Sequence, residues 1–166
     1  MPIPDRFGTD KGMNYWLMKT EPDVFSIDHL KSKKTSSWDG VRNYQARNFM
    51  RDEMKKDDLV LIYHSSCATP GVAGVATVSK ESHPDLSALD KKSEYFDPKA
   101  TKEEPRWYMV EVKFKAKFDR VISLKELKEQ SALKDMTILK KGNRLSITPV
   151  SPKEFDYILD LANLNL

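Results

Sequence analysis

WYMVEVKFKAKF, residues 107–118, shows the clearest periodicity in the chain. One alternating set of positions is apolar: Tyr108, Val110, Val112, Phe114, Ala116 and Phe118. Because successive side chains of a strand point to opposite faces, this pattern predicts a long β-strand with one buried face. Trp107 and Met109 fall on the opposite set, where we expect them to line a cleft.

Shorter patterns on either side of this strand predict the remaining elements. Strands are expected at residues 15–20, 59–63, 71–78 and 145–150, and helices at 26–31 and 43–56 and from Ser123 and Ser151 onward. Ser123 and Ser151 each begin a Ser-x-x-Glu capping box. Glycines within 71–78 indicate that another backbone or a ligand packs closely there. Strands without regularly intervening helices favour an α+β fold with a mixed, curved sheet or small barrel.

The chain of 166 residues has the length of one domain. Residues 1–12 (MPIPDRFGTDKG) are interpreted as a short polar extension, with Met13 as an alternative start, and residues 13–166 as a single domain. Residues 82–106 are polar and contain three prolines. Connections of this length are uncommon in compact domains and are often functional.

Composition excludes several classes of protein. A single cysteine, Cys67, rules out a disulfide framework within the chain and a zinc site with paired cysteines. No apolar run approaches the ~20 residues of a membrane span, and no signal-peptide pattern is present. The net charge of +3 permits a nucleic-acid partner without arguing for one. No cofactor and no metal are expected.

Enzyme signatures such as GxxxxGK[ST], GxSxG and HExxH are missing. His64 and Cys67 are the best catalytic candidates, because a histidine and a cysteine can pair as base and nucleophile. Their spacing at the end of a strand is poor for such a pair. A packed cysteine and a hydrogen-bonded histidine are the favoured interpretation.

SSWDGVRNYQARN, residues 36–48, places Trp38 among hydrogen-bonding side chains instead of apolar ones. Such a combination can hold a planar ligand such as a nucleobase: the aromatic side chain stacks on the base, and the polar side chains form hydrogen bonds with the edge of the base. The alternative is a turn at Asp39, an ion pair at Arg42, a helix cap at Asn43, and Trp38 partly buried under the loop. The residues alone leave both interpretations open.

Six stretches together resemble the EVE domain family over about residues 14–162: YWLMKTEPDVFSIDHL, SSWDGVRNYQARNFMR, DLVLIYHSS, PGVAGVATV, PRWYMVEVKF and RLSITPVSPKEF. The family belongs to the PUA-like superfamily. The resemblance therefore implies a mainly β, α+β fold, a curved β pseudo-barrel flanked by helices. The EVE family is also similar to the YTH domains, which read methylated adenine in an aromatic cage.

The resemblance implies binding without catalysis: a flipped, modified base, above all modified cytosine in DNA, enters an aromatic and polar pocket. Trp38 would stack on the base, and Tyr63 and Trp107 would wall the pocket. Thr20 stands where serine is commoner in the family, so that its methyl group narrows the pocket. The base edge or a nearby phosphate would be contacted by Lys19, Glu21, Asp39, Arg42, Asn43 and Ser65, with Val41 among the pocket residues.

The expected partner is therefore nucleic acid, modified DNA with RNA as an alternative, and no membrane. Such a protein would be cytoplasmic and nucleoid-associated in a bacterium, or nuclear in a eukaryote. An RNA-binding PUA-like module is one competing hypothesis. A nucleic-acid-directed hydrolase that uses His64, Cys67 or Asp39 is another, less favoured one.

Overall fold

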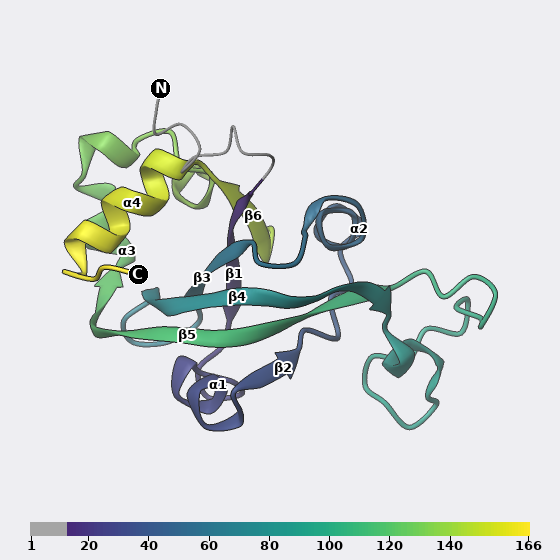
Figure 1. Ribbon diagram of the computed structural model, residues 1–166. Helices are drawn as coiled ribbons and strands as arrows, with labels where there is room; N and C mark the ends of the chain where they lie inside the picture. The colour runs from purple at the N-terminus through teal and green to yellow at the C-terminus, as the bar shows by residue number, and fades with distance from the viewer. Residues whose placement is uncertain (1–12) are drawn as a thin grey trace.

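The computed structural model describes residues 13–166 (Figure 1). The proposed polar extension, residues 1–12, lies outside the described residues. The strands are β1 (Tyr15–Thr20), β2 (Thr35–Ser37), β3 (Leu59–His64), β4 (Gly71–Pro84), β5 (Tyr108–Ser123) and β6 (Ile147–Val150). The α-helices are α1 (Ile27–Lys33), α2 (Tyr44–Asn48), α3 (Leu124–Lys128) and α4 (Pro152–Leu161). One π-helical turn, η2 (Phe49–Glu53), continues α2, and three 3-10 turns follow later: η3 (Leu86–Leu89), η4 (Ser131–Leu133) and η5 (Thr137–Leu139).

The strands form one mixed six-stranded sheet in the order β2-β5-β4-β3-β1-β6. β1 and β3 run parallel, and the other neighbours are antiparallel. Long strands β4 and β5 cross the whole molecule side by side (Figure 1). The predicted α+β class with a mixed sheet is confirmed. None of the helices within residues 13–166 is long and apolar enough to cross a membrane.

Each face of the sheet buries its own core. The α4 core includes Leu17, Leu61, Tyr63, Phe118, Phe155 and Ile158. The α1 core includes Trp16, Met18, Ile27, Leu30, Trp38 and Ile62. Neighbouring residues of β1 and β3 enter opposite cores because strand side chains alternate between faces. This alternation decides which side chains meet at the candidate site.

Strand β5 departs from the single buried face that its sequence predicts. Val110 and Val112 lie in the α1 core, but Phe118 lies in the α4 core. The pairing with β4 shifts register at several places, one of them between Val75 and Ala76. A bulge adds an unpaired residue and turns the strand, so the apolar side chains change cores along its length.

Helix starts follow the predicted caps with one exception. Ser151 forms a complete capping box with Glu154, and Pro152 begins α4 as expected. Ser123 accepts from the backbone N–H of Glu126 at 3.1 Å, but the carboxylate of Glu126 binds Arg120 at 2.6 and 3.0 Å instead of returning to the cap. The second capping box is therefore half formed.

The glycines of β4 allow the close approach that the sequence predicts. A Cβ atom on Gly74 would lie 2.4 Å from the carbonyl oxygen of Ala116, and one on Gly71 would lie 2.2 Å from that of Ile122. Both oxygens belong to β5, so β4 and β5 pack without space for a side chain at these two points. The neighbour is backbone, and no ligand is needed to explain the glycines.

Candidate functional site

Trp38 follows β2 and is fixed from both sides. Its backbone N–H donates to the carbonyl oxygen of Val110 at 2.8 Å. Phe25 packs edge-on against its indole, with ring centroids 6.1 Å apart and an interplanar angle of 88°. Only 9% of Trp38 is exposed. Most of the residue is therefore buried in the α1 core, with Phe25 packed against its ring.

Phe25 belongs to the turn from β1 to α1, which is built by local hydrogen bonds. The hydroxyl of Thr20 donates to the carbonyl oxygen of Phe25 at 2.7 Å. The N–H of Phe25 donates to the carbonyl oxygen of Glu21 at 2.8 Å. Phe25 also stacks on His29 at 5.8 Å, and the Lys33 ammonium lies 5.8 Å from its ring centroid. The turn therefore presents a partly exposed aromatic surface next to Trp38, which sequence reasoning missed.

Asp39, the next residue after Trp38, is exposed and receives no hydrogen bond from another side chain in the described part of the chain. Partial desolvation raises the pKa of its carboxyl, and the nearby charge of Asp85 raises it further. A hydrogen bond with the backbone of Asp39 itself, and the charges of Arg42 and Lys33, act in the opposite direction but do not outweigh these causes. The carboxylate of Asp39 thus keeps acceptor capacity that no other side chain among the described residues uses.

Tyr95 closes this region from the connection between β4 and β5. Its ring lies directly on Gly40: a Cβ atom there would be 2.6 to 2.8 Å from three atoms of the phenol ring. Gly40 also has a φ of +76°, which L side chains rarely adopt. Glycine is required at this position for both reasons. Sequence analysis missed Tyr95 because no local pattern links it to Trp38.

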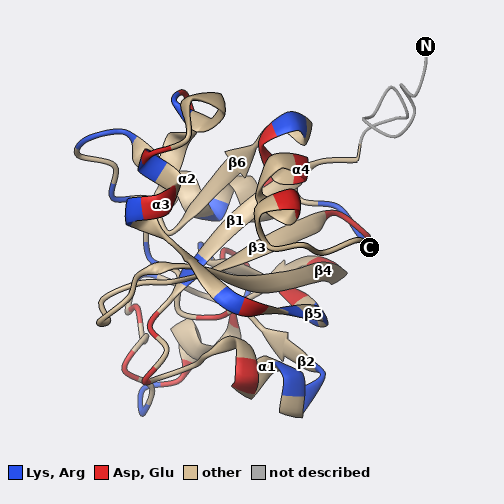
Figure 2. Cartoon of the chain, turned by 90° about the vertical axis from the view of Figure 1, so that its left-hand side faces the viewer, with Lys and Arg blue, Asp and Glu red and all other residues tan. Residues whose placement is uncertain are grey.

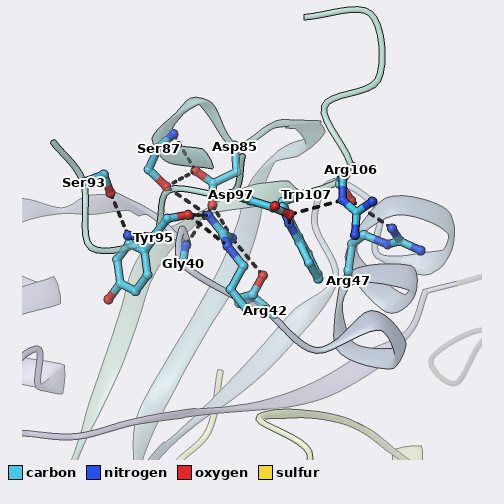
Figure 3. Close-up of polar contacts among 11 residues, drawn as sticks. Gly40, Arg42, Arg47, Asp85, Ser87, Ser93, Tyr95, Asp97, Arg106 and Trp107 are labelled. Atoms are coloured by element: carbon cyan, nitrogen blue, oxygen red, sulfur yellow. Dashed lines mark hydrogen bonds and ion pairs between the residues drawn. The ribbon is translucent and has the colours of Figure 1, made fainter. Parts of the chain in front are cut away.

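Residues 38–43, between β2 and α2, form what we call the Trp38 loop. Arg42 holds this part of the β4–β5 connection against that loop (Figure 3). Its guanidinium donates to the carbonyl oxygen of Tyr95 at 2.8 Å and to Asp85 Oδ2 at 3.1 Å. Asp85, which is 1% exposed, also accepts from the N–H of Gly40 at 2.8 Å and from the hydroxyl of Ser87 at 2.6 Å. We call Gly40, Arg42, Asp85, Ser87 and Tyr95 the Arg42 network.

The charges of the Arg42 network are mutually stabilised. Burial alone raises the pKa of Asp85, but hydrogen bonds from Ser87, Gly40 and Arg42 outweigh it and leave that pKa below its ordinary value. Since the guanidinium donors of Arg42 are used within the protein, Arg42 acts as a positioning residue. The expectation that Arg42 itself contacts a base edge or phosphate has no support in this geometry.

Two other predicted wall residues do not meet Trp38. Tyr63 is buried in the α4 core, on the opposite face of the sheet. Trp107 precedes β5 and is 5% exposed, with its indole N–H donating to Asp97 Oδ2 at 2.7 Å. Their expected role as pocket walls is not supported by this placement. The alternation of β3 turns Tyr63 away, and Asp97 and Tyr44 cover Trp107.

Most of the remaining predicted residues border the site or support it, whereas Lys19 lies on the far face of the sheet. Asn43 caps α2, accepting from the N–H of Ala46 at 2.9 Å, and Val41 is buried in the α1 core. Ser65 donates its N–H to the carbonyl oxygen of Thr20 at 2.9 Å. Lys19 pairs in register with Tyr63 on the far face. Partial burial lowers the pKa of Lys19, and no carboxylate pairs with its ammonium among the described residues.

His64 is engaged within the fold, and no hydrogen bond joins it to Cys67 among the described residues. Nε2 of His64 accepts from the N–H of Ile27 at 3.0 Å, which requires the neutral ring, and desolvation lowers the pKa of His64. Cys67 is a free, partly exposed thiol. Within residues 13–166, no cluster of His, Cys, Asp and Glu side chains has the arrangement of a metal site.

A surface cavity of about 540 Å³ lies away from Trp38, beside α4. It is lined by Tyr15, Leu59, Phe155 and Leu159 together with the chain end. The polar residues predicted for the site do not reach it. In the view of Figure 2, segments with Lys and Arg are interspersed with segments that carry Asp and Glu.

Comparison with known proteins gives consistent matches. The model of the EVE domain matches residues 14–161. Thymocyte nuclear protein 1 from Mus musculus is 42% identical over 167 residues, covering 89% of this chain and 73% of the mouse protein. A solved hypothetical protein from Leishmania major superposes with a TM-score of 0.87 at 53% identity, covering 92% of this chain and 96% of that one. The human THYN1 protein, crystallised in complex with 5-methylcytosine containing DNA, superposes with a TM-score of 0.84 at 41% identity, covering 92% and 99%.

Proposed function

This chain belongs to the EVE domain family, and on that premise we propose that it binds DNA and reads modified cytosine, without turnover. The observation that carries the proposal is the similarity to the human protein solved with 5-methylcytosine containing DNA. That similarity extends over 99% of the human chain in the crystal.

We propose that the flipped base enters between Phe25, Trp38, Asp39 and Tyr95. Flipping costs a few kcal/mol, which stacking on aromatic rings, about 1–3 kcal/mol per base, can offset. Phe25 and the exposed part of Trp38 supply the stacking surface, and Tyr95 supplies the opposite wall. The Arg42 network keeps Tyr95 in place before the base arrives, so less ordering is needed on binding.

Asp39 would select cytosine by its exocyclic amino group. A carboxylate accepts a hydrogen bond from N4 of cytosine, whereas thymine presents the O4 acceptor at the same place. Two facing acceptors repel each other, so thymine is disfavoured. Lys19, Glu21 and Ser65 lie at the ends of β1 and β3, where we propose that they contact the flanking backbone. The unpaired ammonium of Lys19 suits a phosphate.

The test is a binding titration with fluorescent oligonucleotides that differ at one position. Cytosine, 5-methylcytosine and thymine are compared in DNA, and cytosine and 5-methylcytosine also in RNA. We expect the wild-type chain to prefer 5-methylcytosine in DNA. Asp39→Ala should lose about tenfold in affinity for it, equivalent to about 1.4 kcal/mol, and should no longer discriminate against thymine.

Asp119→Asn is the matched control, because Asp119 is an exposed carboxylate on β5 outside the site. Its affinities should equal those of the wild type. Equal binding of cytosine and 5-methylcytosine by the wild-type chain would refute the proposal. Preference for RNA irrespective of methylation would support the RNA-binding alternative, and release of a product from any oligonucleotide would support a hydrolase.

A further inference from the structure

A second cluster of aromatic and cationic side chains lies beside the Trp38 site. It consists of Tyr44, Arg47, Arg106 and Trp107, and we call it the Tyr44 cluster. Tyr44 stacks on Trp107 with ring centroids 4.9 Å apart and an interplanar angle of 18°. Trp107 is buried, but Tyr44 is 50% exposed. An aromatic ring is thus held at the surface on a buried ring.

The Tyr44 cluster is fixed by polar contacts that leave little freedom. Asp97 accepts from the indole N–H of Trp107 at 2.7 Å and from Nε of Arg106 at 3.1 Å (Figure 3). The guanidinium of Arg106 in turn contacts the hydroxyl of Tyr44. Nη1 of Arg47 donates to the carbonyl oxygen of Arg106 at 2.9 Å. The ring and both guanidinium groups are therefore positioned without a ligand.

Arg47 carries positive charge that no carboxylate in the described part of the chain neutralises directly. Its acceptors are the side-chain oxygen of Asn48, at 2.8 and 3.0 Å, and the backbone oxygen of Arg106. The other arginines of this region are ion-paired: Arg42 with Asp85, Arg51 with Asp52, and Arg106 with Asp97. The Arg47 guanidinium lies 4.7 Å from the centroid of Tyr44, so an anion bound by Arg47 would lie next to an exposed ring.

Arg42 connects the two sites. Its guanidinium carbon lies 5.6 Å from the ring centroid of Tyr95 and 5.2 Å from that of Trp107. The Arg42 side chain thus lies between Tyr95, the wall of the proposed base site, and Trp107, on which Tyr44 stacks (Figure 3). A strand that places one base beside Tyr95 would pass within reach of Tyr44.

We propose that Tyr44 and Arg47 hold a flanking nucleotide of the same strand, Tyr44 by stacking on its base and Arg47 by binding its phosphate. An exposed aromatic ring stacks on any base, since every base has a π-face, and arginine binds phosphate irrespective of sequence. This second contact would add affinity without reading the modification. The inference rests on the proposed function, since it assumes that the ligand is a nucleic-acid strand.

The experiment uses the full chain and two single-stranded DNA 12-mers that differ only in one central cytosine, plain or 5-methylated. Tyr44→Ala should weaken binding of both about tenfold and leave their ratio unchanged. Tyr44→Phe, which keeps the ring, should stay within about twofold of the wild type. Arg47→Gln should lower the slope of log K against log salt by about 0.7, the value for one phosphate contact on a single strand. Lys125→Gln, an exposed cation on α3, is the control for charge.

Wild-type affinity in Tyr44→Ala would overturn the inference, as would a loss confined to the methylated 12-mer or a failure of the wild-type chain to bind either strand. A wild-type chain that binds both strands equally would instead refute the reading of 5-methylcytosine, and Tyr44→Ala would still test the second contact. Thermal unfolding of each variant shows that it is folded. Should Tyr44→Ala unfold, the Tyr44→Phe affinity and the Arg47→Gln salt slope decide, and an unchanged slope counts against the proposal.

Discussion

Replacing Asp85 by asparagine tests whether the Arg42 network holds the β4–β5 connection on the Trp38 loop. Asp85 accepts from the N–H of Gly40, from the guanidinium of Arg42, and from both the N–H and the hydroxyl of Ser87. Asparagine keeps the size of the side chain but loses the charge and half of its acceptor capacity. At least one of these donors is then left without a partner.

The size of the effect follows from burial. Breaking a buried ion pair by removing one partner costs about 3–5 kcal/mol. The side chain of Asp85 is 1% exposed but that of Arg42 is 24% exposed, so water recovers part of the loss. We therefore expect Asp85→Asn to lower the free energy of unfolding by about 2–3 kcal/mol at pH 7. The affinity for 5-methylcytosine DNA should fall as well, because Tyr95 is no longer held over Gly40.

The assay is urea unfolding of wild type and Asp85→Asn between pH 7 and pH 3. The folded-state pKa of Asp85 lies below its ordinary value, so its stabilisation is present above the unfolded value, about 3.9. It is lost as the pH falls through the folded value. The difference between the two proteins should therefore be constant from pH 7 to about pH 5 and shrink towards pH 3.

Asp119→Asn controls for the loss of an exposed carboxylate and should change stability by less than about 0.5 kcal/mol. A difference below about 0.5 kcal/mol for Asp85→Asn at pH 7 would contradict the proposed role of the ion pair. A large difference that persists unchanged at pH 3 would show that the effect comes from packing and not from the charge of Asp85.

Gly40→Ala should displace Tyr95 and weaken oligonucleotide binding, because the new Cβ would lie 2.6 Å from Cζ of Tyr95. Gly142→Ala is the matched control: its φ of +80° imposes the same backbone strain, about 1–2 kcal/mol, but nothing lies within 4 Å, so it should lose stability and keep binding. His64→Gln should flatten the decline in stability below about pH 6.5. Because the pKa of His64 is lowered in the folded protein, the unfolded chain takes up a proton that the native ring cannot accept while Nε2 binds the N–H of Ile27. A wild-type stability that does not change between pH 7 and pH 5 would contradict this.

Local patterns were sufficient to predict most of the fold. The limits of β1 agree with the prediction, and α1 and α4 begin at the predicted serine caps. These features depend on neighbours within four residues of each other in the chain. The course of β5 between two cores could not be predicted, because bulges depend on its pairing with β4 and leave no mark in the alternation itself.

The residues of the candidate site also divide into those that local sequence patterns predict and those that only the folded chain brings together. The cap at Asn43 is local, and its prediction is confirmed. The partners of Arg42 come from a connection far along the chain, and no sequence pattern identifies Asp85 and Tyr95 as those partners. The expectation that Tyr63 walls the site did not consider the face of β3, and the structure places Tyr63 in the α4 core, away from Trp38.

Asp39 in the Trp38 loop and Asp85, which is hydrogen-bonded to that loop, have opposite roles. Asp85 is buried, fully hydrogen-bonded and has a lowered pKa, whereas Asp39 is exposed, free of side-chain donors and has a raised pKa, partly because of the charge on Asp85. Environments that separate the pKa values of two neighbouring acids mark a division of function. Asp85 orders the site, and the carboxylate of Asp39 is stabilised most by a ligand that donates a hydrogen bond to it. Protonation of Asp39 removes that acceptor, so affinity for cytosine should decrease as the pH falls through its raised pKa, and Asp39→Asn, titrated with the same 5-methylcytosine oligonucleotide, should lose this dependence.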